Sequence, residues 1–432
     1  MINYNSGCIR EKITQLQYFA KREIMKKVSI FLGTSATLLC IAFNCQAAEL
    51  PKVTIGGYLD TQAGYVKQKL KLGKFKDPNN STSIVGKVSN SGITNDTKIT
   101  IDIEGRINND LKYGGKIKLN ADTSRDAQDN DDNVGDKTMI FLESTSMGLL
   151  EMGAYNSASG KMQISANSIA AKPGGIIGFQ QKWFNSKNSD FSSYSSKFVK
   201  WPLLITNCDC ISSANKLTYY TPKMAGLQFG VSYTPDIAIH GTIDKLKAIP
   251  TQEDQNFKRL IDFGVGYEDK FKDVEVQIAF TGQHGKSKSL MIQRNNLAAW
   301  ELGAVVKLKG FSIAGSYSDW RKSATPIVKD PSKKYGAKYW TLGTGYKYDK
   351  LDTSLTYFRG KRANVYSSDV PLTTASHDAS YNKNEYISLS SSYKATDGFV
   401  PYAEVTHFKA RLYGAPVNNR GYVTLIGTKL SF

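Results

Sequence analysis

The chain has 432 residues, a formal net charge of +18 and a mean hydropathy of −0.36. After residue 48 no apolar run is long enough for a spanning helix, which excludes a helical membrane protein. The basic residues are distributed along the chain instead of forming one patch, which argues against a nucleic-acid-binding protein.

The first element in chain order is typical of a secretory signal. Two lysines precede an apolar stretch from Val28 to Phe43, and the small residues Ala47 and Ala48 suit cleavage. The alternative, a membrane anchor, is disfavoured because a spanning helix needs about 20 apolar residues. We expect 1–48 to be the signal peptide region, with its true start at Met25. Removing its six basic and two acidic residues would lower the net charge from +18 to +14.

Alternation of apolar and polar residues with a period of two recurs through the remainder, residues 49–432. In residues 97–107 isoleucines occupy one face of the predicted strand, and Lys98, Asp102 and their neighbours occupy the other. The next segment repeats the pattern after Asn108-Asn109-Asp110, which favours a tight hairpin turn. Alternation alone would also suit a soluble sandwich.

The spacing of the alternating segments separates these two fold classes. We predict sixteen strands, near residues 52–67, 96–107, 111–121, 136–145, 148–155, 214–223, 226–235, 258–270, 272–283, 296–308, 310–320, 336–348, 351–361, 381–394, 398–410 and 420–432. Short turns alternate with long loops along this series, including loops at 68–95 and 156–213, as in a membrane barrel. An even strand number lets the last strand close antiparallel against the first. The predicted fold class is all-β, a 16-stranded antiparallel transmembrane β-barrel.

Residues 215–236 begin Asn-Lys-Leu-Thr-Tyr-Tyr-Thr-Pro-Lys-Met-Ala-Gly, and residues 143–155 contain Met-Gly-Leu-Leu-Glu-Met-Gly. The first segment resembles the strand-turn-strand segment that follows the third loop of Gram-negative general porins, in particular of the alphaproteobacterial branch. The second is similar to the hairpin before that loop. Residues 53–60 and the terminal Phe432 resemble the first and last strands. The resemblance covers most of the predicted exported domain. It implies a homotrimer in which the third loop of each barrel folds into the pore and forms a constriction.

By this resemblance the third loop is 156–213. A loop of 58 residues without structure is uncommon in a compact domain, and folding it against the inner wall would resolve the conflict. The alternative is an external loop. Apolar residues suited to packing on the wall are Ile176, Ile177, Phe179, Trp183, Phe184 and Trp201.

The candidate selectivity residues are charged side chains on predicted inward faces and in the third loop. They are Lys98, Asp102, Glu104, Arg106, Lys112, Lys116, Lys118, Lys172 and Lys182. Many relatives have an acidic third loop, whereas this one carries six lysines against two aspartates. Because rings of Lys and Arg favour anions, we expect modest anion selectivity. The alternative is that many of these lysines lie at the mouth and contact lipid phosphates.

The last predicted strand ends in an aromatic residue. Tyr422, Ile426, Leu430 and Phe432 share the parity predicted to face lipid, whereas Lys429 has the opposite parity. This ending resembles the C-terminal signal by which the barrel-assembly machinery recognises members of the family. We therefore assign Tyr422, Leu430 and Phe432 to an assembly signal in a chain surrounded by outer-membrane lipid and lipopolysaccharide.

Two other polar features, a cysteine pair and an acidic segment, are more typical of structural or solvent-exposed parts of a protein than of a metal or redox site. Cys208 and Cys210 form a single pair without further cysteine or histidine neighbours, which favours a loop disulfide or free thiols over a metal or redox site. The acidic segment 122–136 does not follow a calcium-loop spacing. It suits a solvated loop or, as in trimeric relatives, a contact with a neighbouring subunit.

No catalytic residue, metal or cofactor is predicted, because no nucleophile–histidine spacing, phosphate loop or dinucleotide motif is present. The predicted function is passive diffusion of small hydrophilic solutes and ions through the outer membrane. Two alternatives stay open: a substrate-specific channel, and a surface adhesin or structural barrel.

Overall fold

The computed structural model describes most of the chain after residue 49. The exceptions are residues 78–79, 123–133, 178–182, 185–197, 206–213, 238, 242–256, 289–292, 326, 328–334, 364–380 and 414–417, and for 72–85 the description covers the backbone alone. The predicted signal region, Lys182, the two cysteines at 208 and 210 and most of the acidic segment therefore lie outside the described residues.

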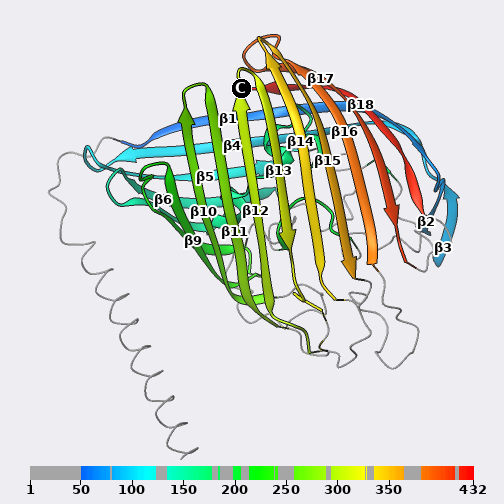
Figure 1. Cartoon of the computed structure of the whole chain (residues 1–432), viewed down its shortest axis with the longest axis horizontal. Coiled ribbons are helices and arrows are strands. Elements are labelled where there is room, and N and C mark those ends of the chain that lie inside the picture. Colours follow the sequence, from blue (N-terminus) through cyan, green and yellow to red (C-terminus); the bar gives the residue numbers. More distant parts are fainter. Residues whose placement is uncertain are drawn as a thin grey trace, which may run out of the picture. The chain divides into compact units, whose positions relative to one another are not determined.

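Sixteen strands form one closed antiparallel barrel in which β1 pairs with both β4 and β18 (Figure 1). The strands are β1 (Lys52–Gln68), β4 (Ser91–Arg106), β5 (Leu111–Asn120), β6 (Gly135–Ser144), β7 (Gly148–Ala154), β8 (Asn215–Tyr220), β9 (Leu227–Asp236), β10 (Phe257–Phe271), β11 (Val274–Ser287), β12 (Leu297–Leu308), β13 (Phe311–Asp319), β14 (Ala337–Tyr348), β15 (Leu351–Ala363), β16 (Tyr381–Tyr393), β17 (Phe399–Arg411) and β18 (Asn419–Ser431). The strand number, the closure and the antiparallel order confirm the predicted fold.

The connection between the first two barrel strands holds a small second sheet. β2 (Leu72–Asp77) and β3 (Asn80–Lys87) pair as a hairpin, so the prediction of a loop over 68–95 was wrong for this stretch. The sequence Ser-Ile-Val within β3 is rich in residues that favour strands. β4 begins at Ser91, five residues before its predicted start at 96.

Alternate residues of the barrel strands face opposite sides, as the period of two predicts. On β18 the side chain of Ile426 is 61% exposed on the outer face, whereas Leu425 is 1% exposed inside the barrel. Tyr422 and Leu430 also lie on the outer face, as predicted. The exposed apolar side chains are thus the outer surface of the barrel, where lipid would cover them.

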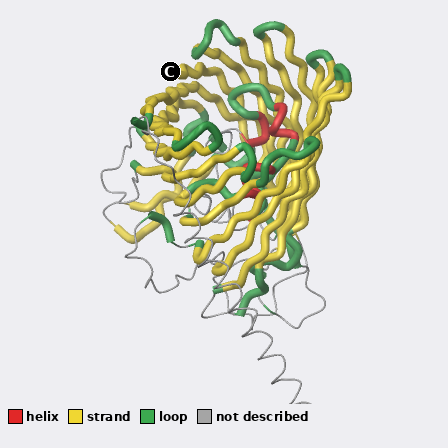
Figure 2. The backbone as a smooth tube through the Cα atoms, turned by 90° about the vertical axis from the view of Figure 1, so that its left-hand side faces the viewer, coloured by secondary structure: helices red, strands yellow, loops and turns green. Residues whose placement is uncertain are grey.

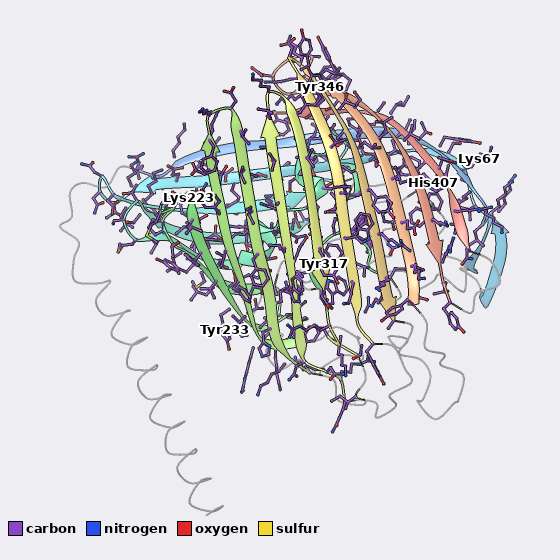
Figure 3. All side chains as sticks on the ribbon, viewed as in Figure 1. Lys67, Lys223, Tyr233, Tyr317, Tyr346 and His407 are labelled. Carbon is purple, nitrogen blue, oxygen red and sulfur yellow. The ribbon has the colours of Figure 1, made fainter. Side chains whose placement is uncertain are left out.

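Aromatic side chains lie on this outer surface toward both ends of the strands. Tyr346 lies at the end with the short turns, and Tyr233 and Tyr317 lie toward the end with the long loops (Figure 3). Near the turns the rings of Phe311 and Tyr346 are 4.3 Å apart. Toward the loops, ring contacts of 5.7–6.1 Å between centroids connect four neighbouring strands through Phe263, Phe280, Trp300 and Tyr317. This distribution suits aromatic belts at the two membrane interfaces.

Asp110 joins two neighbouring short turns. Its carboxylate accepts hydrogen bonds from the Ser144 Oγ (2.7 Å), the Ser146 Oγ (3.0 Å) and the Thr145 backbone N (3.0 Å), and from the Thr145 hydroxyl. These donors, with the Ser144 hydroxyl first, lower the pKa of the Asp110 carboxyl to about 2. The turn between β4 and β5 is therefore tied to the turn between β6 and β7 through an ionised carboxylate.

This contact predicts an acid dependence of stability. Because the folded-state pKa is below the unfolded value of about 4, the contribution of Asp110 is fully present above that value and is lost as the pH falls toward 2. We expect Asp110→Asn to lower the barrel's stability at neutral pH and to narrow its difference from the original protein between pH 4 and 2. Thermal unfolding of the refolded barrel across that pH range measures this. Asp273→Asn, in the turn between β10 and β11, is the matched control, and an unchanged pH profile in Asp110→Asn would contradict the prediction.

Candidate functional site

The third loop enters the barrel after β7. Its described helical turns are α2 (Ala158–Met162), η1 (Ala166–Ile169) and η2 (Gly175–Ile177). They lie on the inner side of the strands (Figure 2), with α2 against β8 to β11, η1 against β12 to β15 and η2 against β15 to β17. The described part of the loop thus follows the inner wall, which confirms the predicted infolding.

Small polar residues on the wall hold the loop by its backbone. Buried amides need acceptors, and alternate wall positions supply hydroxyl and carboxylate oxygens. Four loop amides donate to them: Ala158 to Ser232 Oγ (2.7 Å), Ala166 to Thr341 Oγ1 (3.0 Å), Ala171 to Ser354 Oγ (2.8 Å) and Gly175 to Glu404 Oε2 (3.0 Å). These contacts fix the path of the loop along the wall from β9 to β17.

Asp262, on β10, anchors the beginning of the loop. Its side chain is fully buried, and its Oδ1 accepts from Ser159 Oγ (2.6 Å), Ser157 Oγ (3.2 Å) and Gln283 Nε2 (2.8 Å). Ser157 also caps α2 by accepting from the backbone N of Gly160. Sequence analysis did not single out Asp262, although an aspartate flanked by Leu260, Ile261 and Phe263 in a predicted strand was an available signal.

The returning half of the loop packs through apolar side chains. Phe184 stacks on Phe408 of β17, with ring centroids 4.4 Å apart, and Asn384 Nδ2 donates to the carbonyl of Val199 (2.6 Å). Leu425, on the last strand, is buried in the same cluster. The apolar residue at this inward position is therefore explained by contact with the loop.

Trp183 brings the loop to the first two strands of the barrel. Gly64 of β1 and Gly92 of β4 are register partners, and the Trp183 ring lies over both. A Cβ added to Gly64 would come within 2.7 Å of the ring, so only glycine permits this approach. The described loop residues therefore contact the wall from β8 round to β1 and β4.

Charged side chains line the wall of β4, β5 and β6. Most of them form ion pairs whose side chains are partly exposed to solvent. Lys98 pairs with Asp136 (2.9 Å) and Lys116 with Asp102 (2.8 Å). Lys112 pairs with Glu143 (3.8 Å) and Glu104 (3.9 Å). Each acidic group of the cluster thus neutralises a neighbouring lysine.

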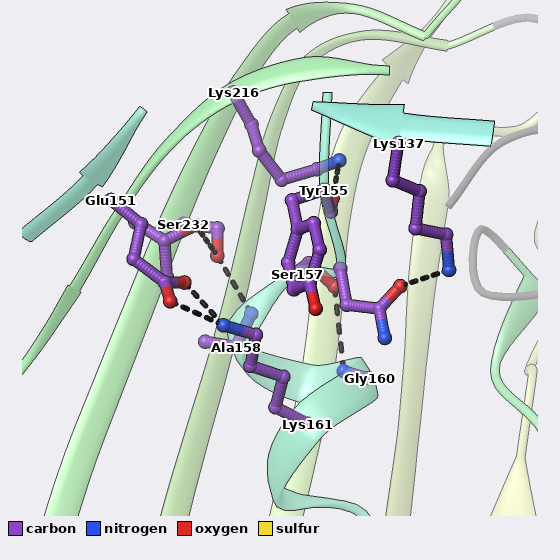
Figure 4. Close-up of polar contacts among 11 residues, drawn as sticks. Lys137, Glu151, Tyr155, Ser157, Ala158, Gly160, Lys161, Lys216 and Ser232 are labelled. Atoms are coloured by element: carbon purple, nitrogen blue, oxygen red, sulfur yellow. Dashed lines mark hydrogen bonds and ion pairs between the residues drawn. The ribbon is translucent and has the colours of Figure 1, made fainter. Parts of the chain in front are cut away.

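Several lysines surround Tyr155, at the point where β7 leads into the loop (Figure 4). The Nζ atoms of Lys161, Lys118 and Lys137 lie 4.7, 5.7 and 6.0 Å from the centroid of its ring. Lys161 also pairs with Glu151, and Lys137 donates to Asn156 Oδ1 (2.7 Å). Attraction between ammonium groups and an aromatic face stabilises such a cluster.

The structure brings some of the predicted selectivity residues together. Four of them lie near the base of the third loop: Lys98, Asp102, Lys116 and Lys118. The charges of the first three act on the Lys118 ammonium group. Glu104, Arg106 and Lys112 lie at the ends of β4 and β5 next to the short turn.

The loop lysines are distributed differently. Lys172 is exposed, and its charge acts on Asp60 of β1 and Lys429 of β18. Lys161 and Lys137, which the selectivity prediction omitted, join the group at Tyr155. Alternation on β6 could have indicated that Lys137 faces inward. The position of Lys161 depends on the path of the loop, which no local pattern predicts.

The chain end closes the barrel. Gly57 N donates to the carbonyl of Phe432 (3.0 Å), and Phe432 N donates to the carbonyl of Gly57 (3.2 Å). The Phe432 ring covers Gly57 on the outer face, where a Cβ would lie 2.9 Å from it.

Within the described part of the chain, no helix is long and apolar enough to cross a membrane. The same residues contain no group of three or more His, Cys, Asp or Glu side chains that could hold a metal ion.

Comparisons with known proteins identify a family and a fold. The sequence model of a family described as "Gram-negative porin" matches residues 34–412. An uncharacterized protein of Rickettsia conorii is 28% identical over 94% of this chain and 100% of its own length. An anion-selective porin from Comamonas acidovorans has a TM-score of 0.54 at 14% identity, covering 88% of this chain and 100% of that one. A complex of Salmonella typhi OmpF with daunomycin has a TM-score of 0.55 at 14% identity, covering 88% and 98%.

Proposed function

Because this chain belongs to the Gram-negative porin family, we propose that it is a diffusion channel with a modest preference for anions. The family and the fold make it a non-enzymatic β-barrel channel of the outer membrane. Small hydrophilic solutes and ions pass such a channel down their gradients, and charged residues beside the path bias which ions enter.

The observation that carries the anion preference is the unequal charge balance beside the third loop. Asp136, Asp102 and Glu151 each pair with a lysine, as described above. Lys118 and Lys137 lie in the same group and form no ion pair with any residue that the structure describes. Among the residues that the structure describes, Lys118 and Lys137 are therefore positive charges without a paired carboxylate, and they would attract anions.

We extend the proposal to assembly and export. The chain would lose residues 1–48 on export, be inserted by the barrel-assembly machinery and form a homotrimer surrounded by lipid and lipopolysaccharide. One similar structure, OmpT of Vibrio cholerae, is titled as a trimer form, with 12% identity and a TM-score of 0.52. Its likeness supports the fold, and the trimer is proposed from the family resemblance.

Current recordings from purified protein in planar bilayers test the channel and its selectivity. In a salt gradient we expect a reversal potential that reports preference for chloride over potassium. Replacing Lys112, Lys116 and Lys118 together by Glu is expected to lower the chloride-to-potassium permeability ratio about tenfold, which corresponds to about 1.4 kcal/mol between the two ions. The reason is the reversed charge along the wall of β4 and β5.

The matched control reverses three lysines in short turns between other strands: Lys272, Lys309 and Lys350. This control changes the net charge equally, and its reversal potential is expected to stay near the original value. Absence of conductance would contradict the channel and leave an adhesin or structural barrel. A cation-selective reversal potential of the original protein would contradict the anion preference.

A further inference from the structure

Lys118 and Lys137 are direct register partners on neighbouring strands. β5 and β6 pair them as Cα partners, and both side chains belong to the group that surrounds Tyr155. Like charges directly opposite each other on a sheet are destabilising. The repulsion is increased by Lys98, whose charge acts on both residues. A bound anion would reduce this repulsion between the two ammonium groups.

The carboxylates that the structure describes near this pair do not serve as that anion. Each of them is engaged by another lysine, in the pairs Asp136–Lys98, Asp102–Lys116 and Glu151–Lys161. Lys137 has one neutral partner, the Asn156 Oδ1 at 2.7 Å, and an ammonium group offers three donors. Donor capacity therefore remains on both members of the opposed pair.

Tyr155 adds a neutral donor at the centre of the group. Its ring lies within 6.0 Å of the Nζ atoms of Lys118, Lys137 and Lys161, and its hydroxyl forms no hydrogen bond with any residue in the described part of the chain. Lys118, Lys137 and Tyr155 bring donors from β5, β6 and the beginning of the loop to one group, and several donors suit a ligand with several acceptor oxygens better than a single halide ion.

We propose that Lys118, Lys137 and Tyr155 form a binding site for a polyvalent oxyanion of the phosphate class. The proposal rests on the channel function and specifies one class of permeating solute. The ligand is a soluble anion rather than a lipid headgroup. Tyr155 lies two residues before Ser157, which caps α2, and α2 packs on the inner wall of the barrel, away from lipid. A phosphate would slow the passage of chloride while it occupies the site.

Inorganic phosphate is the probe. Chloride current through the purified channel is recorded in bilayers of zwitterionic lipid at constant ionic strength while phosphate replaces an inert monovalent anion. We expect saturable block of the chloride current. The double variant Lys118→Gln/Lys137→Gln is expected to raise the half-blocking concentration by at least about tenfold, because two charge-assisted contacts are lost. Lys137→Arg should retain the block.

The matched control, Lys347→Gln/Lys429→Gln, removes two charges elsewhere in the barrel, where Lys347 acts on Asp352 and Lys429 lies over the Tyr58 ring. It is expected to leave the half-blocking concentration unchanged. An equal increase in this control would overturn the site at Tyr155, as would an anion-selective current that phosphate does not block. Absence of any current would overturn the channel function itself. If the double variant does not insert, calorimetric titration of the original protein in detergent with phosphate decides, and absence of binding overturns the proposal.

Discussion

Deletion of Phe432 is expected to reduce the amount of assembled barrel strongly while leaving the conductance of each inserted channel unchanged. Phe432 exchanges two backbone hydrogen bonds with Gly57, and its ring covers that residue on the lipid side. Loss of two such bonds removes about 2 kcal/mol from the contact that closes the sheet. The aromatic end would also be lost as an assembly signal. The site at Tyr155 involves β5 to β7 and is separate from this contact.

Two substitutions separate these contributions. Phe432→Ala keeps the backbone hydrogen bonds and removes the ring, whereas Phe432→Tyr keeps both and is expected to assemble normally. The folded fraction in outer-membrane preparations, measured by heat-dependent gel mobility, is compared with single-channel conductance of the purified protein. Normal assembly of the deletion variant would show that the terminal aromatic is dispensable. A changed conductance would show that the chain end also affects the pore.

Replacement of Asp262 by Ala is expected to release the beginning of the third loop and to increase both conductance and current noise. The carboxylate accepts from Ser157, Ser159 and Gln283 in a fully buried setting. Removing it deprives three buried donors of this acceptor, at a cost of about 3 kcal/mol or more. The barrel itself keeps its strand pairing, because Asp262 holds the loop through its side chain.

The conservative variant Asp262→Asn retains one acceptor oxygen and is the matched control. We expect it to change conductance less than Asp262→Ala and to keep the loop more resistant to protease. Single-channel recording and limited proteolysis of the refolded protein measure the two effects. Equal conductance in the original protein and in Asp262→Ala would mean that the wall hydroxyls and apolar contacts hold the loop without this carboxylate.

Two local features that sequence reasoning missed have different causes. The β2–β3 hairpin was obscured because its alternating segments are short and lie inside a long connection between stronger ones. The turns of α2, η1 and η2 have too few residues for a helical period to emerge. Their stability comes from the wall, through contacts such as Ala166 with Thr341.

The sequence by itself determined the barrel. Period-two alternation states which side of each strand faces lipid, and the alternation of turns with loops sets the strand number and the closure of β18 on β1. It also indicated that Lys98, Lys116 and Lys118 share an inward face, because this follows from local parity.

Only the tertiary structure decided which charges meet. Lys137 lies opposite Lys118 because of the register between β5 and β6, and Lys161 reaches Tyr155 because the loop turns inward at Ser157. Pairing partners depend on distances between segments that are far apart along the chain, and no local pattern encodes those distances. The charge that remains after pairing, and the oxyanion site proposed from it, are therefore properties of the folded barrel.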